Sequence, residues 1–163
     1  PSDRVIVIGA GKLGLLVAQV VRLTGCDLAV VIRHDRQAAL LAQWGIPAVR
    51  FDTLPASQAD VVVDCTGQQA GFANALHLLR ARGTLVLKST YQGLPQADLS
   101  QIAVQEYRVV GSRCGPFDAA LRLLRQKLVD VQSLIEARYT FSDALDAFEH
   151  AARRGALKVL LVP

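Results

Sequence analysis

The feature that most constrains this chain is a glycine-rich turn directly after a short apolar run near the N-terminus. The run Val5–Ile8 leads into the motif Gly-Ala-Gly-Lys-Leu-Gly at residues 9–14. In a strand–turn–helix unit, Gly9 would permit a tight bend, Gly11 would let backbone approach a ligand, and Gly14 would let the helix pack on the strand. The first amides of the helix could then hold a diphosphate. We therefore expect a dinucleotide site here, with a turn needed only for packing as the alternative.

Strand-like and helix-like segments alternate through the larger, N-terminal part of the chain. Apolar runs predict strands at 5–8, 28–32, 48–51, 61–65, 85–87 and 108–110, and helical spacing of apolar residues predicts helices at 12–23, 36–44, 70–82 and 99–106. Strands that alternate with helices form a parallel sheet, and runs that are apolar throughout suit a sheet covered on both faces. The sequence therefore predicts an α/β fold with a parallel sheet. Together with the glycine turn, this indicates the Rossmann type, a doubly wound six-stranded parallel sheet for which the known strand order is 3-2-1-4-5-6.

The pattern changes after Gly111, where a helix-strand-helix-strand addition is expected. Its predicted elements are a helix at 116–127, a strand at 134–139, a helix at 143–153 and a strand at 157–162. Ser142 is predicted to cap the second of these helices. Asp143 and Asp146 would lie in its first turn, where the helix dipole favours anions.

The residues that follow the second predicted strand lack the acidic side chain that selects NAD. In this kind of fold, a carboxylate about 20 residues beyond the glycine turn binds the ribose 2′-hydroxyl of NAD. Ile32, Arg33 and His34 occupy those positions, and Asp35 falls one step further on. The planar guanidinium of an arginine suits a phosphate instead. The sequence favours NADP(H) over NAD(H), although Arg33 and Arg36 could also be solvated charges at a helix entry.

Composition and charge argue against several other classes of protein. Hydrophobic residues make up 52% of the chain, which is too apolar for a disordered protein. The net charge of +4 is spread out, without the basic stripe of a nucleic-acid-binding protein. No apolar run approaches the ~20 residues needed to cross a bilayer. We therefore expect neither nucleic acid nor a membrane as a partner.

The cysteine and methionine counts bear on location and completeness. The chain has three distant cysteines, Cys26, Cys65 and Cys114, with neither zinc-ligand spacing nor a disulfide framework. This fits a reducing, cytoplasmic location. The chain has no methionine, even at position 1, so we interpret it as part of a longer protein.

Several motifs together resemble the zinc-type medium-chain alcohol and polyol dehydrogenase family. The glycine turn is followed by Gln19 and Gly25, as in the family's GxGxxGxxxxQxxxxxG signature. Residues 64–67 resemble its D/E-x-x-G motif, residues 82–87 its G-G-x-x-V motif, and residues 158–161 its last strand. The resemblance extends over the whole chain but covers only the C-terminal, cofactor-binding half of a full-length member. It implies a dinucleotide-binding domain over residues 1–112 and a segment over 113–163 that rejoins the catalytic lobe.

The resemblance also implies roles for particular residues along a cofactor cleft. The amides of Lys12 and Leu13 would hold the pyrophosphate, and Lys158 would approach it. Arg33 and His34 would flank the adenosine ribose. The remaining implied positions lie toward the nicotinamide and its carboxamide: Thr66, Gly67, Ser89, Thr90, Ser112, Arg113 and Cys114. From the residues alone, Ser89 and Thr90 could also be ordinary polar loop residues, and Cys65 and Cys114 fit better as small buried hydrophobes.

The family's zinc ligands lie in an N-terminal lobe that we expect to be missing from this chain. His34, His77 and His150 show no ligand spacing, so we predict no metal ligand and no catalytic residue here. The full-length protein would use zinc to polarise the oxygen of a small alcohol or carbonyl substrate. This part would hold the cofactor and be inactive alone. The resemblance further implies a homodimer or higher oligomer through the sheet edge at 97–111, where an exposed strand invites pairing.

Two other classes of nucleotide-binding protein begin with a similar turn. Nucleotide-sensing regulatory modules of potassium uptake systems open with a strand and a GxGxxG turn, but generally carry an acid at the end of the second strand. S-adenosylmethionine methyltransferases also want an acid there for the ribose hydroxyls. Ile32, Arg33 and His34 provide none, which disfavours both alternatives.

Overall fold

The main body of the protein is a parallel β-sheet, seen in a computed structural model that describes residues 2–91 and 93–163. Within those residues its six strands are β1 (Arg4–Ile8), β2 (Asp27–Val31), β3 (Ala48–Val49), β4 (Ala59–Asp64), β5 (Leu79–Leu87) and β6 (Arg108–Gly111). The strand order is β3-β2-β1-β4-β5-β6, and each neighbouring pair is parallel. The predicted Rossmann-type fold and its strand order are confirmed.

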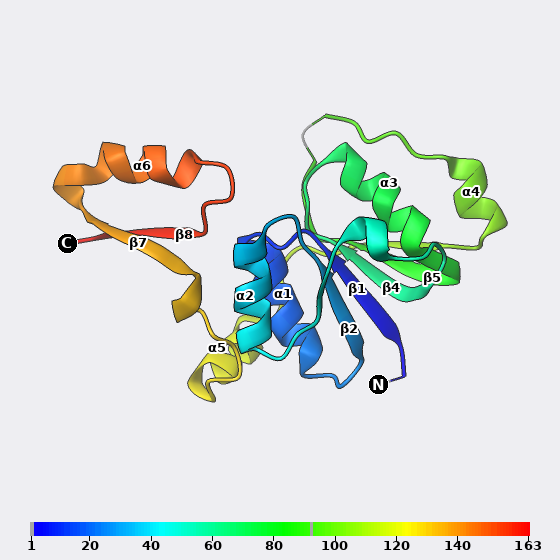
Figure 1. Cartoon of the computed structure of the whole chain (residues 1–163), viewed down its shortest axis with the longest axis horizontal. Coiled ribbons are helices and arrows are strands. Elements are labelled where there is room, and N and C mark those ends of the chain that lie inside the picture. The colour runs from blue at the N-terminus through cyan, green and yellow to red at the C-terminus, as the bar shows by residue number, and fades with distance from the viewer. Residues whose placement is uncertain (1, 92) are drawn as a thin grey trace.

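Helices cover both faces of this sheet, with the strands between them in Figure 1. One side carries α1 (Lys12–Arg22) and α2 (Asp35–Gln43), and the other carries α3 (Gln69–Leu78) and α4 (Leu99–Val104). Successive side chains of a strand point to opposite faces, so both faces of β1 must be apolar. Val5 and Val7 belong to the core under α1 and α2, whereas Ile6 and Ile8 belong to the core under α3.

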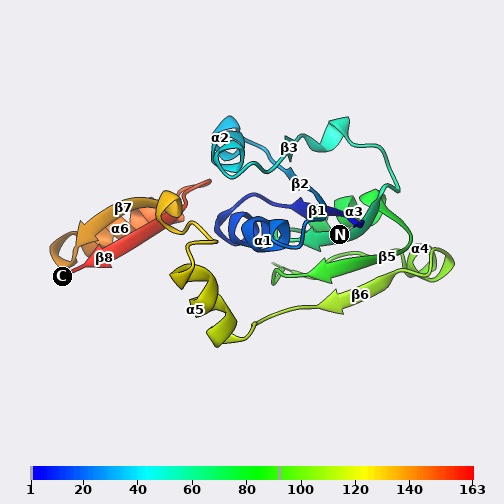
Figure 2. The ribbon, with the colours of Figure 1, turned by 90° about the horizontal axis from the view of Figure 1, so that it is seen from below.

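The C-terminal addition comprises α5 (Phe117–Arg125), β7 (Ile135–Thr140), α6 (Ala144–Ala152) and β8 (Lys158–Val162), in the predicted order. The last three of these elements form a unit at one end of the molecule, beyond α2 (Figures 1 and 2). In the described part of the chain, β7 and β8 form a separate two-stranded parallel sheet. The buried Gln19 side chain joins this unit to α1, because it donates to the Asp130 carbonyl at 3.0 Å and accepts from the Asp130 amide at 2.6 Å.

The predicted helix at 70–82 is too long at its C-terminal end. It ends at Leu78, and β5 begins at once with Leu79. The amides of Ser57 and Gln58 donate to the carbonyls of His77 and Leu78, so the last helical carbonyls are satisfied by the preceding loop. Residues 80–82 therefore belong to the strand rather than to a further helical turn.

Two other predicted boundaries are also wrong. The third strand stops at Val49, because residues 51–53 turn into a short 3-10 helix instead of continuing the pairing to position 51. The helix predicted at 143–153 starts at Ala144, with Asp143 in the N-cap position. Ser142 does not cap it, since its hydroxyl lies 2.5 Å from the Thr140 hydroxyl.

The predicted interface between two copies lies at an exposed edge of the sheet. All four residues of β6 are exposed at the edge of the sheet and are available for such pairing. The pairing of two copies through residues 97–111 stays a prediction.

Among the helices that the structure describes, none has the length and hydropathy required to cross a membrane.

Candidate functional site

The glycine turn lies at the start of α1, and its three glycines differ in what surrounds them. Gly9 has a φ of +97°, and a Cβ atom at Gly14 would lie 1.7 Å from the carbonyl oxygen of Gly9. These two glycines are required for the fold itself. A Cβ atom at Gly11 would meet no atom of the described residues within 4 Å. Packing therefore explains Gly9 and Gly14 but not Gly11, which faces open space.

The N-terminus of α1 is electrostatically suited to an anion. Gly11 is its N-cap residue, and the described residues supply neither a side-chain cap nor an acidic group in its first turn. The first amides of a helix have no partner within the helix, and the helix dipole places partial positive charge there. The amides of Lys12 and Leu13, both exposed residues, belong to this turn. They can hold a phosphate group if one enters the open space beside Gly11.

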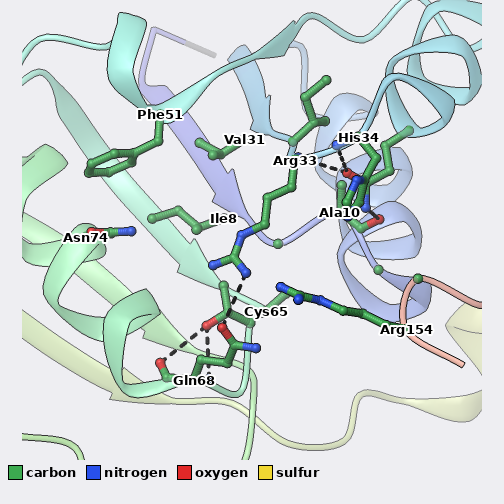
Figure 3. A pocket seen from close by; sticks show the side chains of 16 residues that line it. Ile8, Ala10, Val31, Arg33, His34, Phe51, Cys65, Gln68, Asn74 and Arg154 are labelled. Atoms are coloured by element: carbon green, nitrogen blue, oxygen red, sulfur yellow. Dashed lines mark hydrogen bonds between the residues drawn. The ribbon is translucent and has the colours of Figure 1, made fainter. Parts of the chain in front are cut away.

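A cavity of about 310 Å³ lies in front of this turn, at the carboxyl ends of β1, β2 and β4 (Figure 3). This is where ligands bind in open α/β sheets, because the chain leaves β1 and β4 in opposite directions there. Its lining comes from four regions of the sequence: Ile8, Gly9, Ala10 and Gly11; Val31, Ile32, Arg33, His34, Gln37 and Phe51; Cys65, Thr66, Gln68 and Asn74; and Arg154 and Gly155.

The lining is basic, and among the described residues that form it none is Asp or Glu. Arg33 and Arg154 extend into the cavity from different elements (Figure 3), and the Arg33 guanidinium contacts the Gln68 side chain at 3.4 Å. Asp35, the nearest acid in sequence, has a side chain that is 94% exposed and is paired with Arg50 at 2.7 Å. The cavity is therefore suited to an anionic ligand.

Gln37, which the sequence analysis overlooked, ties the β2–α2 turn to the glycine turn. Its side-chain oxygen accepts from the amides of Arg33 and His34 at 3.0 and 3.2 Å. Its side-chain nitrogen donates to the carbonyl of Ala10 at 2.9 Å. Glutamine three residues beyond a helix N-cap is a known capping pattern, and that signal could have identified it. Gln37 thus holds the two walls of the cavity together.

A buried carboxyl group shapes the far end of β4. Asp64 is fully buried and accepts from the Thr66 amide at 2.8 Å, the Thr66 hydroxyl at 2.7 Å and the Tyr91 hydroxyl at 2.5 Å. Burial and the hydrogen bond to Asp64 raise the pKa of Tyr91. Gly67, with a φ of +66°, lies so close to the next turn that a Cβ atom would be 3.1 Å from the Thr90 carbonyl. Thr66, Gly67, Ser89 and Thr90 consequently lie together.

Cys65 lies on the cavity wall and is half-buried. Burial, followed by the charge of Asp64, raises the pKa of its thiol to about 12. A thiol with so high a pKa is neutral and unreactive at neutral pH. The interpretation as a small buried hydrophobic side chain fits Cys65, but it is wrong for Cys114, which is exposed.

The structure brings together only some of the residues that the sequence analysis assigned to a site. Gly9, Gly11, Arg33, His34 and Thr66 line the cavity. The other assigned positions fall outside the cavity lining as described: Lys12, Leu13, Gly14, Gly67, Ser89, Thr90, Ser112, Arg113, Cys114 and Lys158.

Two groups of outlying positions are placed by specific contacts. The Ser112 amide donates to the Leu87 carbonyl at 3.0 Å, and the Lys88 ammonium donates to the Arg113 carbonyl, so both positions adjoin the end of β5. Lys158 begins β8 opposite Ile135, and its side chain is exposed. Arg154, four residues earlier in the sequence, occupies the cavity instead.

Glu136, in β7, connects the C-terminal unit to the first turn of α2. Its carboxylate accepts from the Leu157 amide at 2.7 Å and lies 3.1 Å from the Arg36 guanidinium and 3.2 Å from the His150 ring. The Leu157 amide, together with Arg36 and His150, lowers the pKa of Glu136 from 4.5 to about 2. The carboxylate is therefore charged at every pH at which the protein is expected to work.

This lowered pKa predicts a specific pH dependence of stability. The native state holds a proton on Glu136 less readily than the unfolded state does, so its stabilising effect is complete above pH 4.5 and is lost as the pH falls toward 2. Urea unfolding of the wild type and of Glu136→Gln is expected to differ most near pH 7 and least near pH 2. A constant difference between the two proteins across that range would contradict this assignment.

The histidines and other metal-binding side chains do not gather in one place. His34 lines the cavity, His77 packs beside Phe51 with ring centroids 5.9 Å apart, and His150 bonds to Tyr139 at 3.0 Å. Over residues 2–91 and 93–163, no group of three or more His, Cys, Asp or Glu side chains is positioned to hold a metal ion. A zinc site does not fit these residues.

Comparison with known proteins identifies the family to which this chain belongs. The sequence profile of the zinc-binding dehydrogenase family matches residues 13–128, which is most of the chain. The chain belongs to that family and corresponds to its C-terminal, cofactor-binding half. Sorbitol dehydrogenase of Gallus gallus is 27% identical to it over 98% of this chain and 50% of that protein. The chain spans about half the length of the curated relatives it matches.

Solved structures share the fold over nearly the whole chain. A zinc-binding dehydrogenase from Sinorhizobium meliloti 1021, bound to NADP, superimposes with a TM-score of 0.89 at 24% identity, covering 99% of this chain and 53% of that one. An alcohol dehydrogenase from E. coli CFT073, complexed with NADH, superimposes with a TM-score of 0.86 at 21% identity, covering 99% and 52%. At these identities, the likeness establishes the fold alone.

Proposed function

We propose that this chain is the cofactor-binding part of an NADP(H)-dependent dehydrogenase that acts on a small alcohol, polyol or carbonyl compound. The observation that carries the proposal is the cavity at the end of β1, which combines open space beside Gly11 with a basic lining that has no carboxylate among the described residues. The substrate class is taken from its relative, a sorbitol dehydrogenase. The solved structures of the same fold include one bound to NADP and one complexed with NADH, so the choice between these cofactors rests on this chain's own residues.

The residues present fit a dinucleotide that extends along the carboxyl ends of the strands. The amides of Lys12 and Leu13 would hold the pyrophosphate at the start of α1. Arg33 and His34 would flank the adenosine ribose, and the Arg33 guanidinium would bind a 2′-phosphate. Hydride transfer to or from a substrate carbon is the chemistry that the nicotinamide supplies when it is bound.

The nicotinamide half would lie over the ends of β4 and β5. Asp64 holds Thr66 through its amide and hydroxyl, and this fixes the turn that carries Gly67. Thr66, Gly67, Ser89 and Thr90 would form that wall of the cleft, with Arg113 near the carboxamide and Lys158 reaching toward the pyrophosphate. In this proposal residues 1–112 hold the dinucleotide and residues 113–163 belong with the catalytic lobe. Two copies would pair through the edge at 97–111.

Ligand titration tests the proposal directly. NADPH, NADH and S-adenosylmethionine would each be added to the protein while its melting temperature and the fluorescence of Trp44 are followed. A ligand that binds only the folded state stabilises it, by about 2.7 kcal/mol at one hundred times its dissociation constant. We expect NADPH to raise the melting temperature more than NADH, and S-adenosylmethionine to have no effect. The proposal would be overturned if S-adenosylmethionine alone raised the melting temperature, or if neither NADPH nor NADH raised it.

Arg33→Ala is expected to remove the preference for NADPH. The variant loses a charge-assisted contact to the 2′-phosphate, so its affinity for NADPH should fall about 10- to 100-fold. Its affinity for NADH should change by less than about threefold, because NADH has no group at that position. Arg125→Ala, at an exposed position in the last turn of α5, serves as the matched control. Equal losses for the two dinucleotides would refute the role assigned to Arg33.

A further inference from the structure

The turn between α6 and β8 reaches back to the cavity, although it belongs to the C-terminal unit. Arg154 and Gly155 line the same space as Gly9 and Arg33 (Figure 3). The neighbouring Arg153 lies outside the cavity lining as described. One of two consecutive arginines is thus selected by the fold to face the cavity. Nothing in the local sequence distinguishes them, so the selection comes from how the turn is held.

Contacts of Leu157, which follows Arg154 in the sequence, hold the turn in place. Leu157, three residues beyond, is buried in the core that also contains Leu28 and Leu41. Its amide donates to Glu136, whose carboxylate also contacts Arg36 in the first turn of α2. The C-terminal unit is therefore attached to the helix that directly follows the Arg33–His34 turn.

The charges of Arg33 and Arg154 are unbalanced within the cavity. Among the described residues, no ion pair joins either guanidinium to a carboxylate. The nearby acids are engaged elsewhere, because Asp35 is paired with Arg50 and Glu136 with Arg36. Two cations that share one space repel each other, and a doubly charged anion between them removes that repulsion. A phosphate monoester has this charge and offers oxygens to two guanidinium groups.

We propose that Arg154 is a second specificity-determining residue, which binds the 2′-phosphate of the adenosine ribose opposite Arg33. Glu136 acts as a positioning residue, because it fixes the turn that carries Arg154 against α2. The inference rests on the proposed function, and it adds that the C-terminal unit, as well as the dinucleotide-binding domain, selects the cofactor. The pyrophosphate is the other phosphate that Arg154 could contact, so the test must separate the two.

The test compares two ligands that differ only in the 2′-phosphate and lack the nicotinamide. They are ADP-ribose and 2′-phospho-ADP-ribose, each measured by isothermal titration calorimetry on the intact protein. Arg154→Ala is expected to weaken binding of the 2′-phosphorylated ligand about 10- to 100-fold and that of ADP-ribose less than about threefold. Arg153→Ala is the matched control, and it should change neither affinity. Arg154→Lys keeps the charge without the planar fork, so it should recover part of the lost affinity.

Each other outcome has a definite meaning. If Arg154→Ala weakens the binding of both ligands equally, the residue contacts the pyrophosphate and the inference is overturned. If the variant binds both ligands as tightly as the wild type does, the inference is also overturned. If the wild type binds neither ligand, the proposed function itself is refuted. Glu136→Gln should reduce only the preference for the 2′-phosphorylated ligand. Melting temperatures measured without ligand verify that each variant is folded. If Arg154→Ala does not fold, the affinities of Arg154→Lys for the two ligands are compared with those of the wild type instead.

Discussion

Replacing Gly11 with alanine is expected to weaken dinucleotide binding about 100-fold or more while the protein remains folded. Gly11 has a φ of −82° and a ψ of −171°, which alanine adopts freely, and its Cβ atom would meet no described atom within 4 Å. The cost to the helix cap is about 1 kcal/mol or less. The same Cβ atom would occupy the path of a diphosphate to the first amides of α1. The loss of two charge-assisted hydrogen bonds corresponds to an affinity reduced about 100-fold or more.

Gly14→Ala provides the contrasting result, because there the fold itself requires the glycine. The new Cβ atom would lie 1.7 Å from the Gly9 carbonyl oxygen, and the backbone must shift to relieve that overlap. We expect a destabilisation of about 3 kcal/mol or more. Gly115→Ala, which meets open space in the described part of the chain, is the neutral control. Urea unfolding and NADPH titration of the three variants separate the two effects. A Gly11→Ala protein that binds NADPH like the wild type would exclude the glycine turn as the diphosphate site.

Asp64→Asn is expected to destabilise the protein by about 3 kcal/mol. One carboxylate oxygen accepts from the amide and hydroxyl of Thr66, and the other accepts from the Tyr91 hydroxyl. An asparagine has only one oxygen, so its amide nitrogen must face at least one of these donors. A buried donor without an acceptor costs about 1–3 kcal/mol, and more where the lost partner is charged. For a chain of this size, the melting temperature should fall by roughly 6–12 °C.

Tyr91→Phe is the matched comparison for Asp64→Asn. It removes one donor and leaves both hydrogen bonds from Thr66 to the carboxylate in place, so the expected loss is about 1 kcal/mol. Thermal unfolding of the two variants measures the difference. Equal losses for both would mean that the Thr66 contacts contribute nothing. A fully stable Asp64→Asn protein would show that the buried hydrogen bonds do not organise this turn.

Most strands of the main sheet were predictable from sequence because the pattern that marks a strand is local. The runs that form β1, β2 and β4 are almost entirely apolar on consecutive residues, as strands buried on both faces must be. Helical periods or turns separate the predicted strands from one another. Glycine at positions 9, 11 and 14 similarly signals a turn through spacing alone. The errors fell at the ends of elements. Amides of the loop before β4 end the helix at Leu78, and the 3-10 turn over residues 51–53 ends the strand at Val49.

The candidate site was only partly predictable, for a related physical reason. Arg33 and His34 follow a strand at the expected distance from the glycine turn, so counting residues locates them. Arg154 has no such signal, because it comes from a turn far along the chain and reaches the cavity only when β7 and α6 are in place. The family resemblance assigned Lys158 a role near the pyrophosphate, and that assignment stays a prediction.

By itself, the sequence determined the strands and helices of the main sheet and the glycine turn at the start of α1, since hydrophobic period and glycine spacing act over a few residues. Only the tertiary structure decided which charges share the cavity. It turned Asp35 out to Arg50, placed Glu136 on Arg36, and brought Arg154 opposite Arg33. Electrostatic interactions depend on distances in space between groups far apart in the chain, and those distances exist only once the two units are packed together.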